Sequence, residues 1–362
     1  MQRIDLNLGA RRCPILIGPG LLGSQALLAE HTGAAQLMIV SNETVAPLWL
    51  PRLREGLAGR PFAQCLLLDG EEHKTLASAA RIIDALVDAR MNRDCMVLAL
   101  GGGVVGDIAG FAAATYQRGV ACLQLPTTLL AQVDSAVGGK TGVNHPGGKN
   151  LIGAFHQPVA VITDTDTLGT LPDRELRAGL AEVIKAALIA DRAFFAWLEL
   201  QIEALLARNP EALAEAIRRA CKIKAGIVER DEREQGARAI LNLGHSFGHA
   251  IETGLGHGRW LHGEAVAAGI VLAAELSGRC GRLAAGDVDR VRTLLVRAGL
   301  PVDPPQLGRE RMLSLLGMDK KVAGGRLRLV LLDAIGAASC TPDFPRDALV
   351  TLLEDRAGTG AA

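Results

Sequence analysis

The sequence CMVLALGGGVVGD (residues 95–107) places an apolar run directly before a glycine-rich turn. The run predicts a buried strand, and the residues that follow the turn predict the start of a helix. Gly101, Gly103 and Gly106 satisfy the pattern G-x-G-x-x-G. Glycines at these positions let backbone amides approach a pyrophosphate at a helix N-terminus, so the stretch is compatible with nucleotide binding.

The glycine pattern does not by itself establish a Rossmann dehydrogenase. In that fold an acidic residue about 20 residues further on binds the ribose, whereas residues 121–128 read ACLQLPTT and Asp107 lies far too early. The pattern is also weakly specific, because the chain contains 42 glycines.

Further strand-like runs flank this stretch. They are QLMIVS (36–41), QCLLLDG (64–70), ACLQLP (121–126) and VAVITD (159–164). Between them, TLASAARIIDALVDAR (75–90) carries apolar residues at helical spacing. This alternation predicts an α/β N-terminal domain over residues 1–170, with a parallel Rossmann-like sheet covered by helices.

The pattern changes after residue 170. LPDRELRAGLAEVIKAALIA (171–190) begins with Pro172 and Asp173, which are typical of a helix start, and continues with helical periodicity. Only LRLVLL (327–332) resembles a strand later in the chain. We expect a mainly α-helical domain over residues 171–362 that binds metal and substrate, with the active site in the cleft between the domains.

Composition favours a soluble globular protein of a reducing compartment. Hydrophobic residues make up 49% and charged residues 22%. Lys+Arg and Asp+Glu balance at 39 each, so an anionic ligand needs a local basic cluster. Seven dispersed cysteines without a C-x-x-C pair argue against a disulfide framework, and the N-terminus lacks the apolar region of a signal peptide. We therefore expect a cytoplasmic protein, without nucleic-acid or membrane partners.

A second glycine-rich run, VGGKTGVNHPGGKN (137–150), resembles a Walker loop. It is not a Walker loop, because the motif G-x-x-x-x-G-K-[ST] requires a glycine at position 134, which is Asp134. Two lysines remain, Lys140 and Lys149, and we expect them in loops flexible enough to wrap a phosphate.

NLGHSFGHAIE (242–252) and LHGEAVAAG (261–269) contain three histidines in glycine-flanked segments. His245 and His249 are four residues apart, which places both on one face of a helix. His262 begins another helical segment, and Glu182 in GLAEVIK offers a carboxylate one turn from Lys185. The set favours a metal site, and spacing leaves open which of the first two histidines is a ligand. The chain has no H-E-x-x-H motif, so a zinc protease would lack its general base.

Several further basic residues are candidates for anion binding: Arg118, Lys224, Arg238, Lys320 and Lys321. Each alone is typical of a solvated surface. Together with the two lysines of the second glycine-rich run, they are able to bind both a phosphate and a carboxylate.

The combination of motifs resembles the 3-dehydroquinate synthase family. The matching segments are DGEEHK (69–74), GGGVVGDIAGFAAATYQRG (101–119), QLPTTLLAQVDSAVGGKTGVNHPGGKN (124–150), GLAEVIK (179–185), DEREQGARAILNLGHSFGHAIE (231–252) and HGEAVAAG (262–269). They run in order across most of the chain.

The resemblance implies roles for individual residues. Glu182, His245 and His262 correspond to the metal ligands, and His249 to a proton-transfer residue rather than a ligand. Glu234 corresponds to a proton acceptor. The substrate positions are Asp134, Lys140, Asn150, Lys185, Lys224, Arg238, Asn242, Arg118 of a neighbouring subunit, and either Lys320 or Lys321. The cofactor positions are Asp69, Gly70, Glu71, Glu72, His73, Lys74, Gly102, Gly103, Val104, Val105, Gly106, Asp107, Thr127, Thr128, Lys140, Lys149, Thr167, Leu168, Gly169 and Thr170.

The resemblance also implies an activity. Enzymes of this family are homodimeric lyases of the shikimate pathway of aromatic amino acid biosynthesis, and they use NAD with Zn²⁺ or Co²⁺. They convert 3-deoxy-D-arabino-heptulosonate 7-phosphate to 3-dehydroquinate and phosphate by transient oxidation, β-elimination, re-reduction and aldol closure. Alternatives are a sugar-phosphate cyclase that acts on sedoheptulose 7-phosphate, a metal-dependent polyol dehydrogenase that releases NADH, and a binding module without activity.

Overall fold

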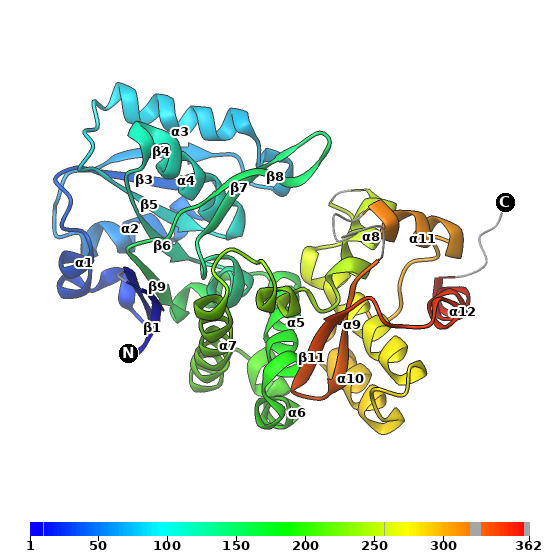
Figure 1. Cartoon of the computed structure of the whole chain (residues 1–362). Coiled ribbons are helices and arrows are strands. Elements are labelled where there is room, and N and C mark those ends of the chain that lie inside the picture. The colour runs from blue at the N-terminus through cyan, green and yellow to red at the C-terminus, as the bar shows by residue number, and fades with distance from the viewer. Residues whose placement is uncertain (10, 257, 319–326, 358–362) are drawn as a thin grey trace. The chain divides into compact units, whose positions relative to one another are not determined.

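The computed structural model describes residues 1–9, 11–256, 258–318 and 327–357, and the chain forms two compact units (Figure 1). The first unit comprises Met1–Pro172 and Leu213–Arg233, and the second comprises Asp173–Ala212 and Glu234–Ala362. The change at Pro172 lies close to the boundary expected after residue 170. Residues 213–233 return to the first unit. The predicted division into residues 1–170 and 171–362 did not include this return. The assignment of NAD to one domain and of metal and substrate to the other stays a prediction.

A seven-stranded sheet forms the centre of the first unit, in the order β1-β2-β9-β6-β5-β3-β4. Its strands are β1 (Gln2–Leu8), β2 (Arg11–Gly18), β3 (Leu37–Asn42), β4 (Ala63–Leu67), β5 (Met96–Gly101), β6 (Ala121–Pro126) and β9 (Ala160–Asp164). All neighbours pair in parallel except β1, which runs antiparallel to β2 at the edge. The predicted parallel sheet is confirmed, and the N-terminal hairpin of β1 and β2 adds to it.

Helices cover both faces of this sheet (Figure 1). They are α1 (Gln25–His31), α2 (Ala46–Gly56), α3 (Leu76–Asp88) and α4 (Gly103–Thr115). Ile39 and Leu98 pack with α1 and α2, while Met38 and Val97, one residue earlier in each strand, pack with α3 and α4. Because successive side chains of a strand point to opposite faces and both faces are buried, the strands read as continuous apolar runs.

Residues 137–150 were expected to be loops, and this expectation is wrong for most of the stretch. β7 (Lys140–His145) and β8 (Gly148–Phe155) form an antiparallel hairpin, so Lys140 and Lys149 lie on strands. Glycine serves here for close strand pairing: a Cβ on Gly142 would lie 2.6 Å from the carbonyl oxygen of Ile152. Glycines used for packing within strands hide the hairpin from a reading of the sequence.

The remaining elements of the first unit are short helices and one long helix. They are η1 (Leu21–Gly23), η2 (Glu71–His73), η3 (Tyr116–Arg118), the π-helical η4 (Ala131–Ser135), η5 (Thr165–Thr170) and α7 (Pro210–Arg230), of which residues 213–230 belong to this unit.

The second unit is mainly helical, as expected. Its elements are α5 (Asp173–Ala190), α6 (Arg192–Leu206), η6 (Ala237–Asn242), α8 (His245–Leu255), α9 (His262–Arg279), α10 (Ala285–Arg297), α11 (Arg309–Met318), β10 (Leu329–Ala334), β11 (Ala337–Thr341) and α12 (Arg346–Ala357). Helix α9 is buried on all sides along residues 265–274 and packs against α5, α8, α10 and α12. The late strand expected at 327–332 is β10; its partner β11 was not expected.

A helix must be both long and apolar to cross a bilayer. Within the part of the chain that the structure describes, no helix is both long and apolar enough to span a membrane.

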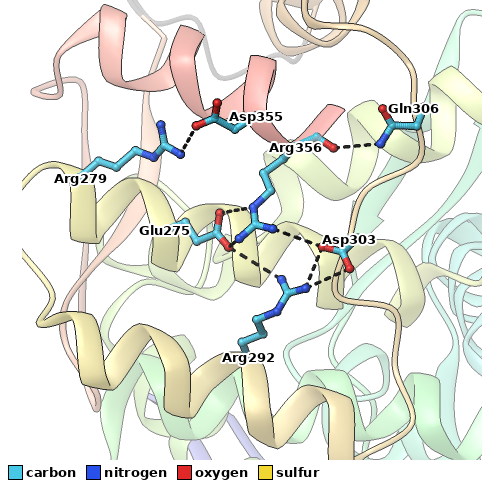
Figure 2. Close-up of polar contacts among 7 residues, drawn as sticks. All are labelled: Glu275, Arg279, Arg292, Asp303, Gln306, Asp355 and Arg356. Carbon is cyan, nitrogen blue, oxygen red and sulfur yellow. Dashed lines mark hydrogen bonds and ion pairs between the residues drawn. The ribbon is translucent and has the colours of Figure 1, made fainter. Parts of the chain in front are cut away.

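An ion-pair network ties the C-terminal helix α12 to the rest of the second unit (Figure 2). Arg356 of α12 donates from Nε to Glu275 of α9 at 2.8 Å, and Arg292 of α10 approaches the same carboxylate at 3.8 Å. Asp303 joins the network by accepting from Arg292 at 2.8 Å. Glu275 is its most protected member, with a side chain only 10% exposed. The carboxylate therefore links three helices.

We predict that Glu275→Ala lowers the free energy of unfolding by about 1–3 kcal/mol, because two guanidinium groups lose a protected acceptor. Midpoints of urea unfolding would measure this loss. Arg279→Ala is the matched control, because it breaks a more exposed pair with Asp355 and should cost less than about 1 kcal/mol. Equal losses in the two variants would contradict the prediction.

Candidate active site

Three side chains able to bind a metal meet where helices α5, α8 and α9 pack together. Glu182 lies in the middle of α5, and His245 and His262 are the first residues of α8 and α9. Glu182 Oε1 lies 3.8 Å from His245 Nε2 and 3.9 Å from His262 Nε2. These distances are too long for hydrogen bonds. They are close to the separation of about 3.4 Å between two ligands of one tetrahedral zinc ion.

The chemistry of this group fits a divalent cation. Glu182 is 2% exposed, and neither of its oxygens accepts a hydrogen bond of normal geometry within the described chain. The Lys185 ammonium forms an ion pair with Glu182 Oε2 and provides one positive charge. A buried carboxylate that faces two imidazole nitrogens presents three acceptors to one point, and Zn²⁺ or Co²⁺ would satisfy them.

The orientation of His245 supports the same conclusion. Its Nδ1 lies 3.2 Å from the carbonyl oxygen of Leu243. A carbonyl can only accept, so it holds the proton on Nδ1 and leaves the lone pair on Nε2, which faces Glu182. Metal-binding histidines are commonly fixed in this way.

His249 lies one turn after His245, with ring centroids 5.6 Å apart, and 6.0 Å from the ring of His262. The predicted i, i+4 arrangement on a helix is therefore confirmed. His249, Glu252 and His262 form a second group whose ligand atoms also lie within 4.8 Å of one another. Glu182 belongs only to the group with His245, and the proton-transfer role of His249 stays a prediction.

The structure places four further predicted site residues in the second unit. Lys185 and Arg238 are buried, and Asn242 donates to Glu234 Oε1 at 2.7 Å. Glu234 adopts a positive φ of 55°. Buried basic side chains and a strained acidic residue are typical of functional sites.

Close backbone contacts set the spacing of the helices that carry the metal-binding group. A Cβ on Gly263, directly after His262, would lie 2.0 Å from the carbonyl oxygen of Ala178 on α5. A Cβ on Gly269 would lie 2.1 Å from the carbonyl oxygen of Gly244, directly before His245. Side chains at these two glycines would push the histidine-bearing helices away from their neighbours.

The residues predicted to bind the cofactor mostly follow the carboxyl ends of strands. Residues 69–74 follow β4, residues 102–107 follow β5, Thr127 and Thr128 follow β6, and residues 167–170 follow β9. Because parallel strands end at one edge of the sheet, these segments share that edge. The turn after β5 leads directly into α4, whose N-terminus can accept an anion.

Lys74 connects two of these segments with the β7–β8 hairpin. Its Nζ donates to Asp107 Oδ2 and to Asn150 Oδ1, both at 2.6 Å. Burial lowers the pKa of Lys74, but Asp107 and Glu71 outweigh this effect, so the pKa is raised overall. Burial raises the pKa of the Asp107 carboxyl, while Lys74 opposes the shift. The pair thus compensates the buried Lys74 ammonium and the partly buried Asp107 carboxylate.

Asn144 is a site-forming residue that the sequence analysis missed. Its side chain donates to Glu71 Oε1 at 2.8 Å and accepts from the Asn150 amide at 2.9 Å. It therefore holds the hairpin against η2. The signal was available, because Asn144 lies two residues before a Pro-Gly-Gly turn, and an Asn near a turn often bonds to nearby backbone.

Asp134 and Lys224 form a pair within the first unit. Lys224 Nζ lies 2.6 Å from both Asp134 Oδ1 and the Asp134 carbonyl oxygen. Lys224 belongs to the stretch of α7 that packs with the first unit, whereas Lys185 and Arg238 belong to the second.

Arg118 is exposed in η3 and adopts a positive φ of 69°. Seven non-glycine residues of the described ranges have a positive φ, and Arg118, Asn150 and Glu234 are three of them. All three were predicted to contact substrate or to transfer a proton, and backbone strain concentrates at such places. Lys320 and Lys321 lie outside the described residues.

Two family models match consecutive parts of the chain: 3-dehydroquinate synthase N-terminal over residues 64–178, and 3-dehydroquinate synthase C-terminal over residues 179–322. A 3-dehydroquinate synthase of Nitrosococcus oceani is 58% identical over 355 residues, covering 98% of this chain and 99% of the relative. The chain belongs to the 3-dehydroquinate synthase family. The resemblance inferred from the sequence motifs is thereby confirmed.

Solved structures extend the comparison from 3-dehydroquinate synthases to other cyclases. The 2-epi-5-epi-valiolone synthase of Streptomyces hygroscopicus subsp. jinggangensis, solved with NAD⁺ and Zn²⁺, superimposes with a TM-score of 0.88 at 30% identity, covering 98% of this chain and 97% of that one. A 2-deoxy-scyllo-inosose synthase complexed with carbaglucose-6-phosphate, NAD⁺ and Co²⁺ gives a TM-score of 0.88 at 26% identity, covering 98% and 100%. The predicted fold class is confirmed, and these two proteins contain the cofactors that the sequence predicted.

We predict that Gly263→Ala separates α5 from α9, destabilises the protein by about 1–3 kcal/mol and weakens Zn²⁺ binding, since the added methyl group has no space. Urea unfolding and competition with a chromophoric zinc chelator would measure both effects. Gly286→Ala on α10 is the matched control, because a Cβ there meets nothing within 4 Å. It should leave Zn²⁺ affinity unchanged, and a similar loss in both variants would refute the packing argument.

A second prediction concerns Lys74→Met, which leaves the partly buried Asp107 without its ammonium partner and should cost about 3 kcal/mol. The pKa of Asp107, already raised by burial, should rise further, so the folded variant binds a proton more tightly than the unfolded chain. Its stability relative to wild type should therefore improve as the pH falls from about 8 to about 5.

Urea unfolding at the two pH values would test this dependence. The double variant Lys74→Met/Asp107→Asn should recover much of the lost stability and lose the pH dependence. A penalty that is independent of pH and persists in the double variant would count against the pairing.

Proposed function

We propose that this chain is a 3-dehydroquinate synthase, a carbon–oxygen lyase that converts 3-deoxy-D-arabino-heptulosonate 7-phosphate to 3-dehydroquinate and phosphate. The observation that carries the proposal is the buried Glu182 carboxylate facing His245 and His262, in a chain of this family. A dehydrogenase or binding protein would not explain the accompanying basic residues.

We assign NAD to the segments at the carboxyl ends of the strands and Zn²⁺ or Co²⁺ to Glu182, His245 and His262. When bound, these groups would supply reversible hydride transfer and Lewis-acid polarisation at C5 of the substrate. The residues of the chain hold them, orient the substrate and move protons.

Oxidation at C5 makes the proton on C6 acidic, and its removal expels phosphate from C7 as the C6–C7 double bond forms. His249 and Glu234 are the proposed proton-transfer residues. After re-reduction at C5, ring opening and an intramolecular aldol closure complete the reaction, so no net redox change remains. The oxidation and the later reduction balance each other.

The basic and amide residues hold the two anionic groups of the substrate in one pose. We assign Lys140, Asn150, Lys185, Lys224, Arg238 and Asn242 to this task, with Asp134 orienting Lys224, and Lys320 or Lys321 in addition. Charge-assisted hydrogen bonds of this kind position phosphate and carboxylate strongly. Arg118 is proposed to reach the site of a neighbouring subunit of a homodimer, and its exposed side chain is compatible with that role. The shikimate pathway and the cytoplasmic location remain predictions.

Incubation of the purified protein with heptulosonate 7-phosphate, NAD and Zn²⁺ should release phosphate and form dehydroquinate in equal amounts, without NADH accumulation. Glu182→Ala and His262→Ala should reduce turnover to background, because the metal loses a ligand, and metal stripping should do the same reversibly. NADH accumulation without phosphate release would indicate a dehydrogenase. Turnover of sedoheptulose 7-phosphate alone would indicate another cyclase, a class with which this chain shares its fold.

A further inference from the structure

Glu252 is a buried carboxylate beside the proposed metal site. It lies on α8, two turns after His245, and only 6% of the residue is exposed. Its Oε1 lies 3.5 Å from Nδ1 of His262 on the neighbouring helix α9. None of the roles assigned above involves this residue.

The two ring nitrogens of His262 face two different carboxylates. Nε2 lies 3.9 Å from Glu182 Oε1, and Nδ1 lies 3.5 Å from Glu252 Oε1. A neutral imidazole has one nitrogen that donates and one that accepts. A carboxylate next to Nδ1 keeps the proton there, which leaves the Nε2 lone pair directed at the metal-binding group.

His245 is fixed in the same way by a different acceptor, the carbonyl oxygen of Leu243, at 3.2 Å from Nδ1. Both histidines therefore present Nε2 to Glu182 and have Nδ1 next to an oxygen. The difference is charge: the acceptor beside His262 is a carboxylate, which also makes the ring a more basic ligand.

We propose that Glu252 is a positioning residue that holds His262 in the Nδ1–H tautomer and strengthens its binding to the metal. The inference rests on the metal site of the proposed function. Because the Lys185 ammonium already compensates part of the Glu182 charge, a second carboxylate at Glu252 would help to offset the charge of a bound divalent cation in a buried setting.

A direct bond from Glu252 to the metal is the competing arrangement, since Glu252, His249 and His262 form the second possible metal-binding group. That arrangement would use Nδ1 of His262 and turn its lone pair away from Glu182. The buried Glu182 carboxylate, whose oxygens accept no hydrogen bond of normal geometry, would then face the two Nε2 atoms without a cation. A metal bound by Glu182, His245 and His262 would therefore compensate a buried carboxylate that the other arrangement leaves without a cation.

The test measures metal binding to the full-length apoprotein, without a catalytic assay. Zn²⁺ affinity would be determined by competition with a chromophoric chelator, and the visible absorption of the Co²⁺ protein would report ligand geometry. Glu252→Ala should weaken Zn²⁺ binding about 10- to 100-fold. Glu252→Gln should lose less, because an amide oxygen can also accept from Nδ1, and should keep the wild-type pattern of Co²⁺ bands.

Glu275→Ala is the matched control: it removes another largely protected glutamate of the same unit, should lower stability and should leave Zn²⁺ affinity unchanged. Wild-type affinity in both Glu252 variants would overturn the inference. A loss above about 1,000-fold in Glu252→Gln, with altered Co²⁺ bands, would also overturn it by indicating a direct ligand. If the wild-type protein binds neither metal, the metal site of the proposed function fails as well, and this outcome is distinct from the others.

Discussion

A negative charge in the buried middle of helix α5 constrains the organisation of the second unit. Glu182 is held away from water, and burial of an uncompensated carboxylate costs several kcal/mol. Lys185 compensates part of this charge from the next turn, and a cation shared with the two histidines opposite would compensate the rest. A metal at this point would therefore stabilise the helical packing as well as the reaction, because the same carboxylate serves both.

The precision of the site comes from backbone contacts rather than from the ligands alone. Gly263 and Gly269 allow α9 to approach α5 and the start of α8. Gly263 directly follows His262, and Gly269 faces Gly244, the residue directly before His245. The ligands and the residues that set their spacing are thus almost adjacent in the chain. Small changes in helix packing would move His262 directly, since it is the first residue of α9.

The sequence predicted those features that depend on local periodicity. The βα alternation, the passage from strand to helix at residues 101–107, the i, i+4 histidines and the helix start at Asp173 all follow from short-range patterns, and the structure confirms them. The β7–β8 hairpin was missed because glycines such as Gly142 break the alternation where strands approach closely. The return of residues 213–233 to the first unit and the contact between Glu252 and His262 depend on tertiary packing, which periodicity does not encode.

The missing ribose-binding acid also has a physical interpretation. The strand that follows α4 is β6, which ends at Pro126 and is followed by Thr127 and Thr128, so hydroxyl groups occupy the place of the acid. The acid that is present, Asp107, lies near the start of α4, where it would repel a pyrophosphate. Lys74 removes this difficulty, because its ammonium lies 2.6 Å from the Asp107 carboxylate. The helix start thereby retains its attraction for an anion, and the same lysine fixes Asn150 of the hairpin, which links the predicted cofactor and substrate residues through one buried cation.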